Sequence, residues 1–499
     1  MNVSIPAPPQ GELGFASSGS RARLSRLHRA GLAQRLAPGI YAVGATLPIE
    51  QVARHHLHAI VAHIFPGGVF CGVSALAGGF PTEGCIYVSH PNPSRTQKVS
   101  LPGLTIYPIL GPGILPGDIL LPQGIAISGQ ARTLVENMDT PGRRPRHRTG
   151  TPAVDDRIDE FDRTGGAGRI KTTLEQLDVI ASSFDQNLVR PIRERLVALL
   201  GTHNNDITPP PSGALQARLD GNPYDSHRLT MIDSLVEMLA QSSPRPVHAI
   251  PPPSRWEWLA FFEAYFSNFI EGTEFGVDEA MRIAVEGVVP QARPADAHDV
   301  SSTYRLAVDD QNRTLVPSSG DDLIHILEDR HRILMAARQD KNPGVIKSVP
   351  NYAGGYEFVK PPLVRETLRR GFDSLNRLND PLMRSVAMMA LITECHPFDD
   401  GNGRVARLTA NAELSKAGQV RIVIPTVYRD EYMRALTGLS GGAGHGESLL
   451  SVLEYAQRWT SAVDWSDYQE ARDVLEECNA FRSTHTGDGK GNRLIFAAR

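Results

Sequence analysis

The chain has 499 residues, of which 41% are hydrophobic and 21% are charged. This length predicts two to four domains, and this composition excludes an intrinsically disordered chain. No stretch approaches the roughly 20 apolar residues that span a bilayer, the four cysteines show no CxxC pairing, and the N-terminus lacks a basic segment followed by an apolar one. We therefore expect a cytoplasmic protein with no membrane contact and no disulfide framework.

Charge is distributed unevenly along the chain. The formal net charge is −4, but residues 1–150 carry 13 Lys and Arg against 6 Asp and Glu, which is +7 there and −11 in the remainder. A basic first segment of this kind can face nucleic acid.

The first 20 residues are rich in Pro, Gly and Ser, show no hydrophobic period, and are predicted to form a flexible tail. Residues 21–31 place two leucines on one face among arginines, which predicts a short basic helix that ends at a glycine. Residues 35–43 predict a β-hairpin around a Pro-Gly turn. Short strands and turns then alternate as far as about residue 140, and residues 153–200 are predicted to be a helical connector.

Three stretches of this front region, LSRLHRAGLAQRLAPGIYAV, FCGVSALAGGF and SGQARTLVENMD, resemble the N-terminal region of AbiE-type antitoxin regulators. Over residues 21–140 the resemblance implies a winged helix followed by a small α/β domain, with Arg23, Arg26 and Arg29 on a DNA-recognition helix. A helix-turn-helix needs an earlier helix, which residues 1–20 do not predict, so a protein-interaction module is the alternative to DNA binding.

Beyond Trp256 the pattern changes to long amphipathic helices, and residues 225–480 are predicted to form a mainly helical domain with a tail at 481–499. The expected helices span roughly 256–272, 276–288, 321–338, 361–378, 380–395, 404–417 and 428–437. One short extended segment interrupts them at 355–359, just before two prolines.

The stretch HPFDDGNGRVAR carries the clearest chemistry, because a base, an anion-binding turn, a carboxylate and two arginines lie within twelve residues. A Gly-Asn-Gly turn leading into a helix gathers backbone N–H groups that bind phosphate. His396 is the nearby group that titrates near neutrality and can take a proton from a hydroxyl. Asp400 can hold Mg²⁺ between phosphate oxygens. The pattern predicts phosphoryl or nucleotidyl transfer.

These residues match at every fixed position the signature HxFx(D/E)GN(G/K)RxxR, so the C-terminal domain resembles the Fic family. The resemblance implies that His396 is the general base for a target Ser, Thr or Tyr hydroxyl that attacks the α-phosphate of ATP. It implies nucleotide binding with Mg²⁺ by a set of residues: Asp400 (also the metal ligand), Gly401, Asn402, Gly403, Arg404 and Arg407. Gly403 in place of Lys favours nucleotidyl transfer over kinase-like activity.

A second motif ends the helix expected at 256–272. Ser267, Glu271 and Gly272 match the family's inhibitory pattern (S/T)xxxE(G/N), in which the glutamate pairs with the motif's last arginine. A carboxylate on Arg407 would occupy the cation and repel phosphate. The alternative is an ordinary helix with a C-terminal glycine.

A third piece, GGYEFVKPP at 354–362, lies upstream of the catalytic helix as the family's target-binding flap does. The candidate target contacts are Tyr356, Glu357 and Phe358, which would register the target by β-strand addition. A purely structural hairpin is the alternative.

We therefore predict a multidomain protein whose C-terminal domain has a mainly α Fic fold with a small β-hairpin flap, preceded by a winged-helix-like α/β region. The expected activity is adenylylation of a protein hydroxyl by ATP, inhibited by Glu271. Two alternatives stay open. One is a DNA-binding regulator with a sensory Fic site, and the other is a Fic enzyme that uses another nucleotide or removes AMP.

Overall fold

The computed structural model describes residues 12–92, 97–138, 147–201, 207–243, 246–249, 256–441, 446–483 and 492–496. The chain forms two compact units, residues 1–221 and 222–499. Within the described ranges, no helix combines the length and the apolar character that a membrane crossing requires. Parts of both predicted tails, residues 1–11, 484–491 and 497–499, lie outside the described residues.

The first unit begins with a small antiparallel sheet. Its strand order is β1–β3–β2, formed by Glu12–Phe15, Ile40–Val43 and Ala33–Ala37. Helix α1 (Arg21–Arg29) packs on it through the buried Leu24. The predicted tail is therefore wrong at residues 12–15, because these residues pair with β3 of the hairpin. Between residue 12 and α1 there is no helix, so the described residues lack the first helix of a helix-turn-helix.

A six-stranded mixed sheet follows, in the order β6–β7–β5–β4–β9–β8. The pairs β5–β7 and β4–β9 are parallel and the other neighbours are antiparallel. In this order the strands span Val99–Leu101, Leu104–Leu110, Cys85–His90, Val69–Phe70, Ile125–Ile127 and Ile119–Leu121. The helices of this region are α2 (Ile49–His55), α3 (Leu57–Ile64), α4 (Val73–Leu76) and α5 (Gln130–Asn137).

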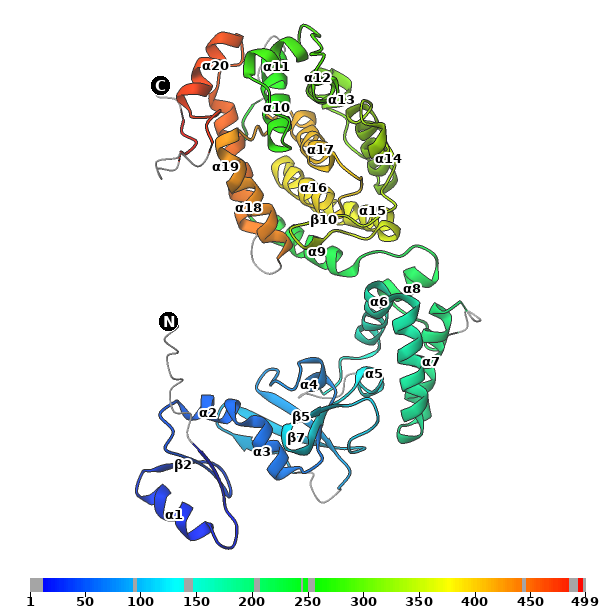
Figure 1. Ribbon diagram of the computed structural model, residues 1–499, viewed down its shortest axis with the longest axis vertical. Coiled ribbons are helices and arrows are strands. Elements are labelled where there is room, and N and C mark those ends of the chain that lie inside the picture. The colour runs from blue at the N-terminus through cyan, green and yellow to red at the C-terminus, as the bar shows by residue number, and fades with distance from the viewer. Residues whose placement is uncertain are drawn as a thin grey trace. The chain divides into compact units, whose positions relative to one another are not determined.

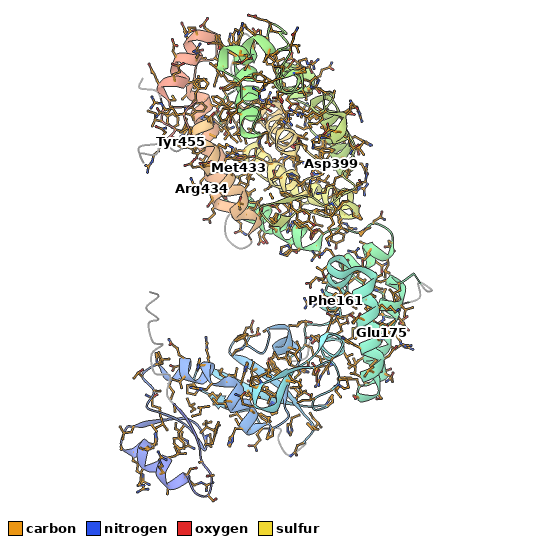
Figure 2. The ribbon with its side chains drawn as sticks, in the orientation of Figure 1. Phe161, Glu175, Asp399, Met433, Arg434 and Tyr455 are labelled. Carbon is orange, nitrogen blue, oxygen red and sulfur yellow. The ribbon has the colours of Figure 1, made fainter. Side chains whose placement is uncertain are left out.

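Three further helices complete the first unit: α6 (Thr151–Ile180), α7 (Gln186–Leu199) and α8 (Gly213–Leu219). Their buried apolar residues form one core with those of α5. On α6, two arginines approach the ring of Phe161, which is labelled in Figure 2. The Arg157 and Arg169 guanidinium carbons lie 5.1 and 4.3 Å from its ring centroid. The predicted connector is thus helical, and it is packed against the α/β region instead of forming a separate spacer.

The second unit is mainly helical, and α16 (Pro381–Cys395) and α17 (Asn402–Lys416) lie side by side in it (Figure 1). The helices around this pair are α9 (Ser226–Gln241), α10 (Trp256–Ile270), α11 (Val277–Ala284), α12 (Pro294–Val308), α13 (Asp310–Arg313), α14 (Gly320–Leu334), α15 (Val364–Leu375), α18 (Arg429–Ser440), α19 (Gly446–Ala462) and α20 (Tyr468–Glu477). A two-stranded hairpin, β10 (Tyr352–Ala353) and β11 (Tyr356–Glu357), interrupts them.

Local sequence explains where the central pair begins and ends. Asp380 caps α16 by accepting the N–H groups of the second and third helical residues, after a proline at the first. Helix α16 ends at His396, which is followed by a proline, and α17 begins after Gly401. One short loop therefore joins the C-terminus of α16 to the N-terminus of α17.

Part of the predicted C-terminal tail is packed. Leu494 is buried, its carbonyl accepts the Tyr455 hydroxyl at 2.9 Å, and the Ile495 N–H donates to the Cys478 carbonyl. Residues 492–496 therefore belong to the second unit.

Candidate active site

His396 ends α16 in a left-handed conformation, with φ 46° and ψ 61°. Its Nδ1 lies 3.2 Å from the Thr393 carbonyl oxygen. Because a carbonyl can only accept, Nδ1 carries the hydrogen and Nε2 keeps a lone pair. This tautomer leaves Nε2 able to accept a proton.

The imidazole of His396 is half-buried and stacks on Phe358 of the flap, with ring centroids 3.8 Å apart and planes 11° from parallel. Burial, with a smaller contribution from the Lys347 ammonium, lowers the pKa of His396 to about 4. The ring is therefore neutral at neutral pH, which is the state that a general base requires.

The loop after His396 is anchored by His331 of α14. The His331 ring stacks on the buried Phe398 with centroids 3.9 Å apart. Its Nδ1 accepts the Gly344 N–H at 2.8 Å, so its Nε2 carries the hydrogen and donates to the Asp400 carbonyl at 3.1 Å. Burial lowers the pKa of His331 to about 4, which keeps this arrangement neutral. The motif gave no sign of His331, which lies 65 residues earlier in the sequence than His396.

Helix α17 begins at Asn402, so of the predicted Gly-Asn-Gly turn only Gly401 precedes the helix, and the asparagine side chain binds the loop backbone. The Asn402 side chain accepts the Phe398 N–H and donates to the Phe398 carbonyl, both at 2.8 Å, so it closes the loop instead of pointing outward. Gly401 has φ 73°, and a Cβ there would lie 2.9 Å from Met335 Sδ. The N–H groups of the first turn of α17 have no intrahelical acceptors, which makes this end of the helix a site for an anion.

A carboxylate already lies at this helix end. A Cβ on Gly403 would collide with Oε1 of Glu271, which closely approaches the first turn of α17. The same oxygen accepts the Arg407 guanidinium at 2.6 Å. Arg407 is buried and also donates to the hydroxyl and the carbonyl of Ser267, both at 2.9 Å. The structure thus brings Ser267, Glu271 and Arg407 together, as the second motif predicted.

Arg404 does not share this position with Arg407. Its guanidinium is 3% exposed and lies 3.1 Å from the Asp299 carboxylate of α12. Asp299 in turn accepts two hydrogen bonds from Arg338, at 2.8 and 3.0 Å. Both arginines were expected to bind the nucleotide, and in this conformation Arg404 is held by Asp299 while Arg407 is held by Glu271. Asp299 could not be found from the motif, since it is 105 residues earlier in the sequence than Arg404.

Two of the three flap residues predicted to contact a target, Tyr356 and Phe358, point inward. The Tyr356 hydroxyl donates to the buried Glu394 carboxylate at 2.6 Å, and the Arg228 guanidinium covers its ring at 4.5 Å. Phe358 is 9% exposed and lies on His396. The Glu357 carboxylate accepts the Tyr352 hydroxyl at 2.9 Å. The two aromatic side chains fix the hairpin beside the loop that carries His396, and the assignment of the three residues as target contacts stays a prediction.

Lys347 is a further buried residue at this loop. Its ammonium donates to the Asn351 side chain at 2.6 Å and to the Cys395 carbonyl at 3.3 Å, and its N–H donates to the Pro397 carbonyl. Asn351 also donates to the Phe398 carbonyl at 2.9 Å. Burial lowers the pKa of Lys347 to about 8. Together these contacts tie the segment before the flap to the loop that carries His396.

Asp400 is exposed, and its Oδ1 accepts the Gly401 N–H at 2.6 Å. The preceding Asp399, labelled in Figure 2, accepts the Asn342 side chain at 2.8 Å. Within the described residues, no group of three or more His, Cys, Asp and Glu side chains could hold a metal by itself. A single exposed carboxylate beside an anion site is nevertheless the donor set that Mg²⁺ uses when phosphates complete its shell.

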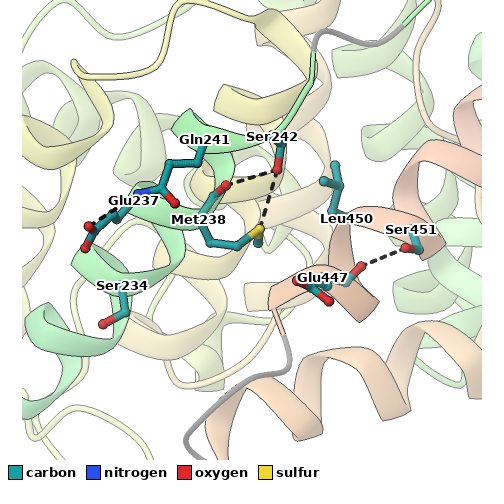
Figure 3. A pocket seen from close by; sticks show the side chains of 8 residues that line it. All are labelled: Ser234, Glu237, Met238, Gln241, Ser242, Glu447, Leu450 and Ser451. Carbon is teal, nitrogen blue, oxygen red and sulfur yellow. Dashed lines mark hydrogen bonds between the residues drawn. The ribbon is translucent and has the colours of Figure 1, made fainter.

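Two further features include none of the active-site residues described above. A pocket of about 570 Å³ between α9 and α19 is lined by Glu237, Glu447 and their neighbours (Figure 3), and none of the predicted site residues contributes to it. In the first unit, Arg23, Arg26 and Arg29 are exposed on α1.

The comparison with known protein families matches the part of the chain that contains His396 and Arg407. Residues 322–414, from α14 to α17, match the family model described as "Fic/DOC family". The chain is 27% identical over 181 residues to protein adenylyltransferase fic-1 of Caenorhabditis elegans, covering 35% of this chain and 36% of that protein. It is 28% identical over 221 residues to protein adenylyltransferase Fic of Drosophila ananassae, covering 42% and 43%.

These two matches span 36% and 43% of the length of the respective relatives, which is less than half of each. Among solved structures, the chain is similar to Fic-1 (residues 134–508) of C. elegans, with 16% identity, a TM-score of 0.34, and coverage of 62% of this chain and 87% of that one.

Proposed function

We propose that the second unit transfers AMP from ATP to a hydroxyl group of a protein and that Glu271 inhibits this activity. The observation that carries the proposal is the position of the Glu271 carboxylate, paired with Arg407 at 2.6 Å and close against Gly403 at the start of α17. An acidic side chain at an anion site blocks a competing phosphate both by occupying the cation and by charge repulsion. A purely structural helix end would not need a carboxylate there.

The reaction follows from the groups around His396. Nε2 takes the proton from a Ser, Thr or Tyr hydroxyl, whose oxygen forms a bond to the α-phosphorus of ATP. The bond from that phosphorus to the bridging oxygen breaks, and pyrophosphate leaves with the electron pair. The N–H groups at the start of α17, and Arg407 once Glu271 has moved, would stabilise the charge on the phosphates. Phe358 holds the imidazole plane while the proton moves.

Asp400 would hold Mg²⁺ against the phosphates, and the ion would offset their negative charge. The carboxylate needs little rearrangement for this, because it is exposed and its orientation is already set by the Gly401 N–H.

The protein target would add along the flap. Strand β10 is exposed and pairs on one side with β11, which leaves a short edge for an extended segment of the target. The exposed Tyr352 is the side chain on that strand that such a segment would meet.

Transfer of label from α-³²P-ATP with Mg²⁺ tests the proposal on the full chain. Glu271→Gly should label itself or lysate proteins strongly, wild type weakly, and Glu271→Gly/His396→Ala not at all. Labelled GTP and UTP, and release of AMP from a modified protein, separate the related activities. If Glu271→Gly transfers no nucleotide from any donor, the proposed function is wrong.

DNA binding by the first unit is a second candidate, favoured by the exposed Arg23, Arg26 and Arg29 beside the β2–β3 hairpin. In the AbiE-like resemblance, helix α1 corresponds to the DNA-recognition helix. Binding of a labelled duplex should weaken steeply with salt and be lost in the triple alanine variant. Unchanged binding in that variant would exclude α1 as the contact.

A further inference from the structure

Helix α10 and the residue that follows it present a row of polar side chains to α17, about one turn apart. Glu263 Oε1 accepts the Asn411 amide at 3.0 Å, Ser267 accepts Arg407 at 2.9 Å, and Glu271 accepts Arg407 at 2.6 Å. The partners run in the opposite order along α17, from Asn411 back toward Gly403. The two helices are therefore antiparallel, and their register is defined by these polar contacts.

Glu263, two turns before Glu271, is the buried end of this row. It is 4% exposed and pairs with the fully buried Arg421 at 2.6 Å. Arg421 also donates to the Ala307 carbonyl of α12 at 2.7 Å. Asn411 is fixed independently, because it exchanges two hydrogen bonds with the backbone of Ile422. Glu263 is thus held between α17, the segment after it, and α12.

A buried ion pair gives little net stability, since desolvation opposes the attraction between the charges. Its better-attested effect is to specify register, because any shift leaves a charge unpaired in the interior. Most of the remaining buried surface of α10 is apolar, with Phe261, Phe262 and Phe266 in an aromatic cluster. The buried Asn268 is the exception among the described contacts to α12, since its amide donates to the Thr303 hydroxyl at 3.0 Å. Apolar contacts of this kind tolerate a shift far better than a paired charge does. Glu263 therefore specifies the register of α10 on α17, which the phenylalanine contacts do not specify.

We propose that Glu263, held by Arg421 and Asn411, is a register lock that positions Glu271 on Arg407. A rotation of one residue along an α-helix is about 100°, which is enough to remove the Glu271 carboxylate from α17. The inference rests on the proposed function in one respect: displacement of Glu271 should raise the rate of AMP transfer.

The test compares wild type, Glu263→Gln, Glu271→Gly and the double variant, with Glu413→Gln as a matched control. Glu413 is also a buried carboxylate of this bundle, but its ion pair is with Arg384, between α17 and α16. Two quantities are measured: hydrogen exchange of the backbone amides of residues 268–273, and labelling from α-³²P-ATP. Arg421→Lys, which keeps the charge but loses the fork, serves if Glu263→Gln does not fold.

We expect Glu263→Gln to speed exchange at residues 268–273 and to raise labelling several-fold above wild type. In the Glu271→Gly background it should add nothing, because the residue that it positions is gone. Glu413→Gln should change neither quantity. The lock is overturned if Glu263→Gln exchanges its amides at the wild-type rate, or if it labels at the wild-type rate while Glu271→Gly labels strongly. It is also overturned if Glu413→Gln changes exchange and labelling as much as Glu263→Gln does. If Glu271→Gly is silent, the proposed function has failed and the exchange result alone decides the lock.

Discussion

Substituting Glu271 by glutamine separates charge from bulk in the inhibitory contact. Glutamine keeps the size of the side chain beside Gly403 but replaces the ion pair with Arg407 by a hydrogen bond from that cation to a neutral acceptor. A hydrogen bond that involves charged groups contributes about 1.5–3 kcal/mol, which sets the upper limit on what removal of the acceptor's charge can cost. Because 29% of the Glu271 side chain is exposed, the lower end applies, about 1.5 kcal/mol. This predicts labelling by Glu271→Gln about tenfold above wild type.

The assay is the initial rate of label transfer from α-³²P-ATP at a fixed concentration, with Glu271→Gly as the upper reference. Glu274→Gln is the control, because Glu274 is an exposed glutamate three residues later and should leave the rate unchanged. If Glu271→Gln labels at the wild-type rate while Glu271→Gly labels strongly, the block is steric and the electrostatic reasoning is refuted.

Three further predictions concern the base, the flap and the first unit. Burial lowers the pKa of His396 to about 4, so its neutral form predominates down to about pH 5. The rate of labelling by Glu271→Gly should therefore not fall with a midpoint near 6.5, the ordinary histidine pKa. A midpoint near 6.5 would contradict the buried position of the imidazole. Tyr356→Phe removes a hydrogen bond to the buried Glu394 and should cost about 1.5–3 kcal/mol in urea denaturation of the full chain, whereas an unchanged unfolding midpoint would mean that this bond is not formed in solution. Arg132→Leu leaves the Asp118 and Glu136 carboxylates of the first unit without their cation. It should destabilise that unit by about 3–5 kcal/mol, measured by thermal unfolding. A variant as stable as wild type would show that the two carboxylates are protonated or hydrated.

Local patterns predicted several long helices of the second unit. The helices expected at 256–272, 380–395 and 404–417 correspond to α10, α16 and α17 within two residues at each end. Helix α12 was missed because it begins with a proline and is rich in Ser, Thr, His and Asp, which are weak helix formers. It forms because its apolar residues pack on α10 and because Asp299 meets arginines from elsewhere in the fold.

Strand β1 was missed for a related reason. Four residues in a Pro-, Gly- and Ser-rich segment show no hydrophobic period. Their extended conformation depends on pairing with β3, which the local sequence does not predict. The inward orientation of Tyr356 was missed as well, because Glu394 and Arg228 come from two other helices.

The sequence by itself determined the loop between α16 and α17. A helix stopped by Pro397, a left-handed glycine at 401 and a new helix from Asn402 are all consequences of neighbouring residues, so the motif could be interpreted without a fold. Only the tertiary structure decided which carboxylate each arginine meets. Arg407 pairs with Glu271 and Arg404 with Asp299, across separations of more than 100 residues, because buried charges pair with whichever opposite charge the packing of α10, α12 and α17 brings within reach.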